Sequence, residues 1–86
     1  MKHNIYADGK FQNIEFKAGD LDKSVGVVES GTYNFTTERE ETVECLTGVL
    51  VINGNKCLPG QKITIGANEL FTITAEEDSS YICSYR

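Results

Sequence analysis

Short segments of alternating or β-branched residues, separated by turn signals, make up most of this chain. Asp8-Gly9, Asn53-Gly54 and Pro59-Gly60 are turn signals, because glycine and asparagine tolerate positive φ angles and proline presets one turn position. No window carries a sustained helical period of apolar residues with caps at its ends. The pattern therefore predicts an all-β fold of about eight to ten short strands, arranged as a sandwich or barrel.

The expected strands follow one another closely along the chain. They cover residues 11–16, 24–29, 33–37, 43–46, 46–52, 56–58, 62–65, 70–75 and 80–85. Residues 1–6 are polar and are expected to fray, whereas the β-branched run at residues 24–29 predicts a strand buried on both faces. Gly48 interrupts a strand pattern, which indicates a bulge or a close backbone approach. The length of 86 residues predicts one domain spanning residues 1–86.

The functional predictions depend mainly on the stretch Gly31–Gly48, GTYNFTTEREETVECLTG. It combines an alternating strand, an acidic turn and a second strand. Tyr33 and Thr37 share one face of the first strand, since side chains alternate with a period of two. Thr37, Arg39 and Glu41 follow at the far end of this unit. We expect their polar side chains to converge on a pocket there.

Composition excludes several classes of function. The net charge of −5 argues against a nucleic-acid polymer as partner, because phosphate backbones need a basic surface. No apolar run approaches the roughly 20 residues that span a membrane, and the N-terminus lacks a signal-peptide core. We therefore expect a cytoplasmic protein with no membrane partner. Three cysteines without a CxxC spacing predict a reducing compartment and small buried side chains at Cys45, Cys57 and Cys83.

The chain lacks the residues that metal sites and catalytic triads need. His3 is the only histidine, and it lies in the segment that is expected to fray. Zinc and iron sites rely on imidazole or thiolate ligands, and Ser-His-Asp or Cys-His catalysis needs a positioned histidine base. The carboxylates at residues 38–41 and 76–78 are interpreted as solvated turns. The sequence thus predicts no metal site and no triad.

Arg39 is the cation that most suggests a phosphate site. It extends the face of the preceding strand, and a guanidinium can hold phosphate with two parallel hydrogen bonds. The competing interpretation is a weak ion pair with Glu38 or Glu41. Aromatic side chains on the strand patterns are interpreted as core, although one or two could stack on a base or sugar; these are Tyr33, Phe35, Phe71, Tyr81 and Tyr85.

Several segments, taken in order and spacing, carry a family resemblance over nearly the whole chain. They are Asn4–Phe16, Ser24-Val25-Gly26-Val27, Gly31-x-Tyr33-x-Phe35-x-Thr37, then Glu41, Gly48, Gly60, Ala67-Asn68 with Phe71, and Ser80-Tyr81-x-Cys83-x-Tyr85. The C-terminal segment is the most specific of them. In this order they resemble the small pyrimidine/purine nucleoside phosphorylases of the cupin superfamily. Gly66, where family members often carry proline, and residues 17–23 and 38–40 depart from the family pattern.

The resemblance implies a single-domain cupin barrel, jelly-roll-like, that forms a homodimer. It also implies phosphorolysis of many purine and pyrimidine nucleosides to the free base and ribose 1-phosphate, with no metal or organic cofactor. Metal-binding cupins carry histidines at positions that correspond here to Thr37, Arg39 and Phe71, counted from Gly31 and Gly60. Counting back from Gly48 gives Asn34 and Thr36 instead. Neither register contains histidine.

A site hypothesis follows from the expected chemistry. Displacing a base from the anomeric carbon passes through a state resembling an oxocarbenium ion. Arg39 with the Thr37 hydroxyl is predicted to bind phosphate, and Glu41 to contact the ribose hydroxyls or the developing cation. The predicted substrate-binding residues are Tyr33, Thr37, Asn68, Phe71 and Tyr81. Two alternatives stay open: a non-catalytic cupin that binds a small sugar or nucleotide, and a metal-dependent cupin oxygenase, which the missing histidines disfavour.

Overall fold

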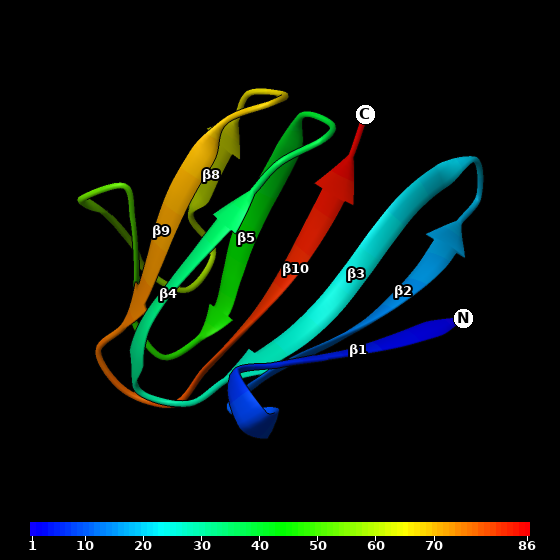
Figure 1. Ribbon diagram of the computed structural model, residues 1–86. Coiled ribbons are helices and arrows are strands. Elements are labelled where there is room, and N and C mark those ends of the chain that lie inside the picture. The colour runs from blue at the N-terminus through cyan, green and yellow to red at the C-terminus, as the bar shows by residue number, and fades with distance from the viewer.

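The computed structural model describes all residues from 1 to 86, and its regular secondary structure is strand apart from one short 3₁₀ turn (Figure 1). The elements are β1 (Lys2–Tyr6), the short 3₁₀ turn η1 (Ala7–Gly9), β2 (Phe11–Ala18), β3 (Leu21–Val28), β4 (Gly31–Thr36), β5 (Glu41–Thr47), β6 (Leu50–Ile52), β7 (Asn55–Cys57), β8 (Lys62–Ile65), β9 (Leu70–Ala75) and β10 (Ser79–Tyr85). The all-β prediction is therefore confirmed. No helix reaches the length and apolar character that a membrane crossing requires.

The strands form two antiparallel sheets. One has six strands in the order β1-β2-β3-β10-β5-β8, and the other has four in the order β4-β9-β6-β7. The chain passes between the sheets several times, and in Figure 1 β4 and β9 of the four-stranded sheet lie in front of β5 and β8 of the six-stranded sheet. No hydrogen-bonded ladder joins the two sheets, and closure into a complete barrel stays a prediction.

The apolar core lies between the two sheets. It contains fourteen buried side chains: Phe11, Val28, Tyr33, Val43, Cys45, Leu50, Ile52, Cys57, Ile65, Phe71, Ile73, Ala75, Tyr81 and Cys83. The three cysteines are free thiols and all are buried, as the sequence predicted. Burial of apolar surface of this kind is the main favourable contribution to folding.

The strand β3 differs from its prediction. Val28 is buried, but Val25 and Val27 are exposed by 40% and 59%. The prediction of burial on both faces is wrong, because the four-stranded sheet covers only one face of the six-stranded sheet. Ile14 on β2 pairs with Val25 and is also exposed on that outer face.

The N-terminal residues also differ from their prediction. Instead of fraying, Lys2–Tyr6 forms β1 and pairs along its whole length with β2, where Tyr6 lies opposite Phe11. The Tyr6 ring makes edge contacts with Phe11 and Phe35, at centroid distances of 6.0 and 5.3 Å. Aromatic pairs of this geometry stabilise a contact beyond their buried area. Cross-strand pairing and this aromatic anchor therefore order a segment whose composition is polar.

Two glycines permit close approaches that a side chain would block. Gly48, with φ of +82°, lies so near β10 that a Cβ would be 2.7 Å from the Asp78 carbonyl oxygen. This confirms the close backbone approach predicted at Gly48. Gly26 on β3 lies beneath the ring of Tyr81, and a Cβ there would be 2.4 Å from ring carbons. The missing side chain at Gly26 thus decides where the Tyr81 ring lies.

Candidate active site

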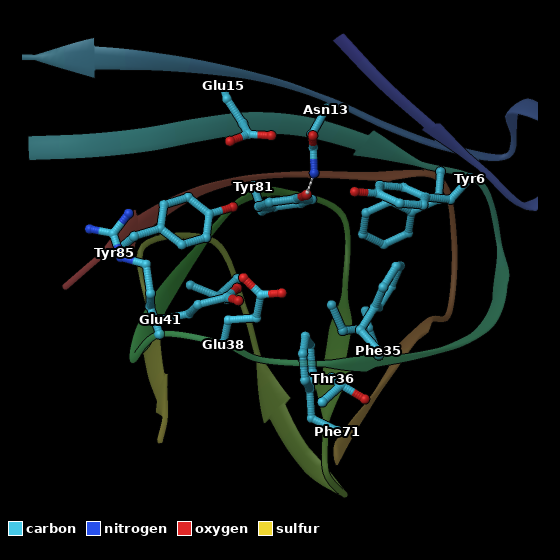
Figure 2. A pocket seen from close by; sticks show the side chains of 14 residues that line it. Tyr6, Asn13, Glu15, Phe35, Thr36, Glu38, Glu41, Phe71, Tyr81 and Tyr85 are labelled. Carbon is cyan, nitrogen blue, oxygen red and sulfur yellow. Dashed lines mark hydrogen bonds between the residues drawn. The ribbon is translucent and has the colours of Figure 1, made fainter. Parts of the chain in front are cut away.

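A cavity of about 260 Å³ lies between the two sheets. Six strands and the turn between β4 and β5 contribute its walls. The lining side chains are Tyr6, Phe11, Asn13, Glu15, Phe35, Thr36, Glu38, Arg39, Glu41, Val43, Phe71, Ile73, Tyr81 and Tyr85. Residues far apart in the sequence, from Tyr6 to Tyr85, therefore meet around one space, and Figure 2 shows it from close by.

One end of the cavity is aromatic. Phe35 is its centre, with ring centroids of Phe11, Tyr6 and Phe71 at 4.8, 5.3 and 5.8 Å. Figure 2 shows Tyr6 and Phe35 together at this end, away from Glu41 and Tyr85. Flat apolar faces of this kind bind planar rings by burial and stacking. This end suits an aromatic heterocycle.

The opposite end is polar and carries charge. Glu15, Glu38 and Glu41 bring three carboxyl groups to the lining, and Arg39 brings a guanidinium. Burial raises the pKa of Glu41 above its ordinary value, although a hydrogen bond from Cys83 Sγ to Glu41 Oε1, 3.4 Å long, works against the rise. Carboxylates at this end can accept hydrogen bonds from hydroxyl groups and stabilise a developing positive charge.

Arg39 is held by three contacts. Its Nη1 donates to Asp22 Oδ2 at 2.8 Å, its Nε donates to the Arg86 carbonyl oxygen at 3.1 Å, and its guanidinium carbon lies 5.8 Å from the centroid of the Tyr85 ring. Asp22 also pairs with Lys17 at 3.1 Å, and hydrogen bonds from Arg39 and Lys17 lower the pKa of Asp22. The ion-pair partner of Arg39 is therefore Asp22 and not Glu38 or Glu41. The guanidinium is positioned at the cavity with donors left for a ligand.

Tyr81 forms the wall of the cavity on the side of the six-stranded sheet. Its ring passes over Gly26, and its hydroxyl oxygen accepts a hydrogen bond from Asn13 Nδ2 at 3.0 Å. Burial is the main cause of a strong rise in the pKa of Tyr81, so the phenol keeps its proton. Figure 2 shows the hydroxyl and Asn13 facing one another above the cavity.

Four predicted site residues line this cavity: Arg39, Glu41, Phe71 and Tyr81. They come from the β4–β5 turn and from β5, β9 and β10, and only the tertiary structure shows that they meet. The structure thus brings together the predicted cation, one carboxylate and two aromatic walls.

Three predicted site residues do not line it: Tyr33, Thr37 and Asn68. The buried Thr37 hydroxyl donates to the Gly66 carbonyl oxygen at 2.6 Å and accepts from the Glu69 amide at 2.9 Å, which ties the β4–β5 turn to the β8–β9 loop. The Tyr33 hydroxyl donates to the Glu29 carbonyl oxygen at 2.8 Å. Asn68 is exposed in a turn with φ of +57°.

Sequence reasoning missed the contribution of β1 and β2 to the cavity. Tyr6, Asn13 and Glu15 all line it. A signal was present in β2, where Phe11, Asn13 and Glu15 alternate on one face. Because Phe11 marks the buried face, the period of two places the two polar side chains inside as well. Tyr6 had no such signal, since its strand was not expected.

No three histidine, cysteine, aspartate or glutamate side chains come together in a group that could hold a metal ion. This holds over the whole chain, residues 1–86.

Solved structures show which fold this architecture belongs to. A protein of unknown function from Vibrio parahaemolyticus matches with a TM-score of 0.90 at 26% identity, over 99% of this chain and 97% of that one. An RmlC-like cupin from Shewanella frigidimarina matches with a TM-score of 0.77 at 9% identity, over 98% of this chain and 81% of that one. The two-sheet fold is therefore cupin-like, as the resemblance implied.

Sequence comparison identifies the family. The model of the pyrimidine/purine nucleoside phosphorylase family matches residues 1–85. Proteins of that name from Yersinia enterocolitica and Cellvibrio japonicus are 36% and 33% identical to this chain, over 99% and 98% of its length and 97% of each relative. The match runs through every strand that lines the cavity. This chain belongs to the pyrimidine/purine nucleoside phosphorylase family.

Proposed function

We propose that this protein catalyses the phosphorolysis of purine and pyrimidine nucleosides to the free base and ribose 1-phosphate. The observation that carries the proposal is the division of one cavity into an aromatic end and a charged end. A nucleoside has the same division, with a flat apolar base at one end and a hydroxylated sugar at the other. The cavity volume of about 260 Å³ suits one small ligand and no polymer.

The base would lie at the aromatic end, against Phe35 and Phe71. These two rings are 5.8 Å apart between centroids and are tilted by 31°, so they offer a broad face without a matched set of polar groups. An apolar wall of this kind discriminates weakly between ligands of similar shape. Broad specificity for purine and pyrimidine bases is consistent with such a wall.

The ribose would lie beside Glu41, with Glu15 and Glu38 nearby on the lining. Carboxylates can accept hydrogen bonds from the sugar hydroxyls. The hydrogen bond from the hydroxyl next to the anomeric carbon strengthens as positive charge develops on the sugar. A partly buried carboxylate stabilises such a charge more than an exposed one, because the surrounding dielectric is lower. Glu41 therefore has the proposed catalytic role.

The phosphate would bind at Arg39. The Asp22 and Arg86 contacts fix the guanidinium at the cavity and use only two of its five N–H donors. Hydrogen bonds between a guanidinium and phosphate are charge-assisted and can be bidentate. Thr37 is proposed to act indirectly, through the hydrogen bonds that hold the β4–β5 turn, which contains Arg39. Tyr33 and Asn68 are proposed to support the site from outside the cavity lining.

A homodimer in the cytoplasm, each subunit a single domain of residues 1–86, is the proposed assembly. Exposed apolar side chains on the outer face of the six-stranded sheet support it: Ile5, Ile14, Val25 and Val27 are between 40% and 59% exposed. Ile14 pairs with Val25, and Val25 pairs with Ile82, so the apolar positions are contiguous. A second copy covering this patch would add burial to a domain of marginal size.

The test is release of free base from a panel of purine and pyrimidine nucleosides, with and without inorganic phosphate. Arg39→Ala protein purified in the same way controls for host phosphorylases. Release that requires phosphate, with ribose 1-phosphate as co-product, is the expected result. Release without phosphate would indicate a hydrolase. Saturable nucleoside binding without product would indicate the non-catalytic alternative.

A further inference from the structure

A directed chain of hydrogen bonds ends at Tyr81 in the cavity. Asn4 Nδ2 donates to Glu15 Oε2 at 2.5 Å and to Asn13 Oδ1 at 2.9 Å. Asn13 Nδ2 then donates to the Tyr81 hydroxyl oxygen at 3.0 Å. All four side chains project from the inner face of β1, β2 and β10, and Asn13, Glu15 and Tyr81 line the cavity.

The direction of this chain is determined at its first member. An ionised carboxylate only accepts, so Glu15 requires the Asn4 amide to present its NH₂ group. The same Asn4 NH₂ group also donates to Asn13, so the Asn13 side chain must present its carbonyl oxygen to Asn4. The NH₂ group of Asn13 is then left to donate to Tyr81. The Tyr81 oxygen is therefore an acceptor in this contact, and its proton must point elsewhere.

The Tyr81 proton has no acceptor within the protein. The Tyr81 hydroxyl donates no hydrogen bond to any side chain or backbone carbonyl group, and Tyr81 as a whole is only 4% exposed. The hydroxyl lines the cavity, so its free proton is available to a ligand. A buried donor without a partner costs free energy, and a ligand acceptor at this point would recover it.

We propose that the Tyr81 hydroxyl donates a hydrogen bond to the acceptor that all nucleobases carry next to the glycosidic nitrogen: N3 of purines and O2 of pyrimidines. These two atoms occupy equivalent places beside the sugar and are both acceptors. One donor can therefore recognise every substrate without selecting among them. The inference rests on the proposed phosphorylase function and adds a specific contact to it.

The contact would act on the departing base. A phosphate oxygen forms the new bond to the anomeric carbon while the C1′–N bond breaks and its electron pair passes to the base. The proton of hydrogen phosphate ends on the base, so atoms and charge balance without a proton from the enzyme. Tyr81 keeps its proton and stabilises negative charge that grows at N3 or O2 during bond breaking.

The experiment compares adenosine with 3-deazaadenosine, which lacks the N3 acceptor, in wild-type and Tyr81→Phe protein. The quantity compared is the ratio of kcat/KM for adenosine to kcat/KM for 3-deazaadenosine. We expect this ratio to be roughly 10- to 100-fold larger in wild type than in Tyr81→Phe. Phenylalanine keeps the ring over Gly26, and a melting curve checks that the variant is folded. 7-Deazaadenosine is the matched control, because its N3 is intact and its preference ratio should be equal in both proteins.

Asn13 supplies a second test as a positioning residue. In Asn13→Asp the new carboxylate accepts a hydrogen bond from the Tyr81 hydroxyl. The phenol is retained, but its O–H group now points toward the carboxylate and away from the ligand. This variant should lose discrimination against 3-deazaadenosine as Tyr81→Phe does. Asn13→Ala leaves the phenol proton free but no longer orients it, so its discrimination should lie between that of wild type and that of Tyr81→Phe.

The outcomes separate the two proposals. Equal discrimination in wild type and Tyr81→Phe, or a change with 7-deazaadenosine instead, would overturn the inference while leaving the phosphorylase proposal intact. Absence of phosphate-dependent adenosine cleavage by wild type would overturn both.

Discussion

Around β2 and β3, the six-stranded sheet locally reverses the usual distribution of polar and apolar side chains, although the rest of its inner face belongs to the apolar core. On β2, the inward-facing Asn13 is 9% exposed, whereas the outward-facing Ile14 is 44% exposed. On β3, the buried Gly26 lies against the Tyr81 ring, whereas the neighbouring Val27 is 59% exposed. Polar groups inside a small domain need partners there, and apolar groups outside need a cover. The comparison supports the proposed ligand site on the inner face and the proposed subunit contact on the outer face.

The largest expected effect is at the charged end of the cavity. Arg39→Ala should lower kcat/KM for phosphate by about 100-fold, because a charge-assisted contact to the phosphate is lost. Initial rates over a phosphate titration measure it. Lys62→Ala is the matched control, since Lys62 is an exposed cation with only a long contact to Glu44. Equal phosphate dependence in both variants would remove Arg39 from the mechanism.

Glu41→Gln should lower kcat by about 10-fold or more, because the amide no longer carries the negative charge that stabilises the developing cation. Wild-type activity should also fall as the pH decreases through the raised pKa of Glu41, since protonation removes the same charge. In Glu41→Gln this acidic limb of the pH–rate profile should disappear. Glu44→Gln, on the outer face of β5, is the control and should keep the wild-type profile.

Glu41 also predicts a pH dependence of stability. Its folded-state pKa is raised by burial, so its stabilising contribution is fully present below the ordinary pKa of 4.5 and is lost as the pH rises through the higher folded value. Glu41→Gln should therefore be more stable than wild type at neutral pH, and the difference should vanish at acidic pH. Urea unfolding at both pH values measures it. A constant difference would show that burial of the charge is not the cause.

Gly26→Ala tests the inner face by packing. The new Cβ would lie 2.4 Å from the Tyr81 ring, so the ring must move and its contact with Asn13 is strained. Overpacking of this kind costs about 1–3 kcal/mol. Thermal unfolding measures the loss. Val25→Ala, on the outer face of the same strand, should change the stability of the subunit fold much less.

Val27→Lys tests the outer face and should have the smallest effect on the fold itself. Exposed substitutions away from special contacts change stability by roughly 0.5 kcal/mol or less. If a second copy covers this face, however, the new charges should convert the dimer to a monomer. Light scattering after gel filtration measures the mass, with Val27→Thr as control. A dimer that persists in Val27→Lys would place the subunit contact elsewhere.

The strand content was predictable because its signals are local. Asn53-Gly54 forms the hairpin turn between β6 and β7, with φ of +49° and +80°, as its residue types require. The buried cysteines and the strand of residues 62–65 also follow from neighbours in the sequence. Local chemistry decides turns and strand periods, so these predictions needed no knowledge of the rest of the chain.

The cavity was only partly predictable because it depends on contacts between distant strands. Arg39, Glu41 and Tyr81 all line it, although they come from a turn and from two different strands. Thr37 lies next to them in sequence, but its hydroxyl is used by Gly66 and Glu69, and those bonds could not be read from the pattern. The spacing of residues along a strand predicts which face of the sheet a side chain lies on, but it does not predict the group to which that side chain hydrogen-bonds.

The sequence alone determined an all-β chain, its turns, its lack of histidine ligands and its family, because these depend on residue type and spacing. The tertiary structure decided that β1 is ordered, that Asp22 pairs with Arg39, and that Asn13 and Tyr81 meet over Gly26. It also decided which face of β3 is buried. Strand pairing joins residues that are tens of positions apart, and the energy of each such contact depends on both partners at once.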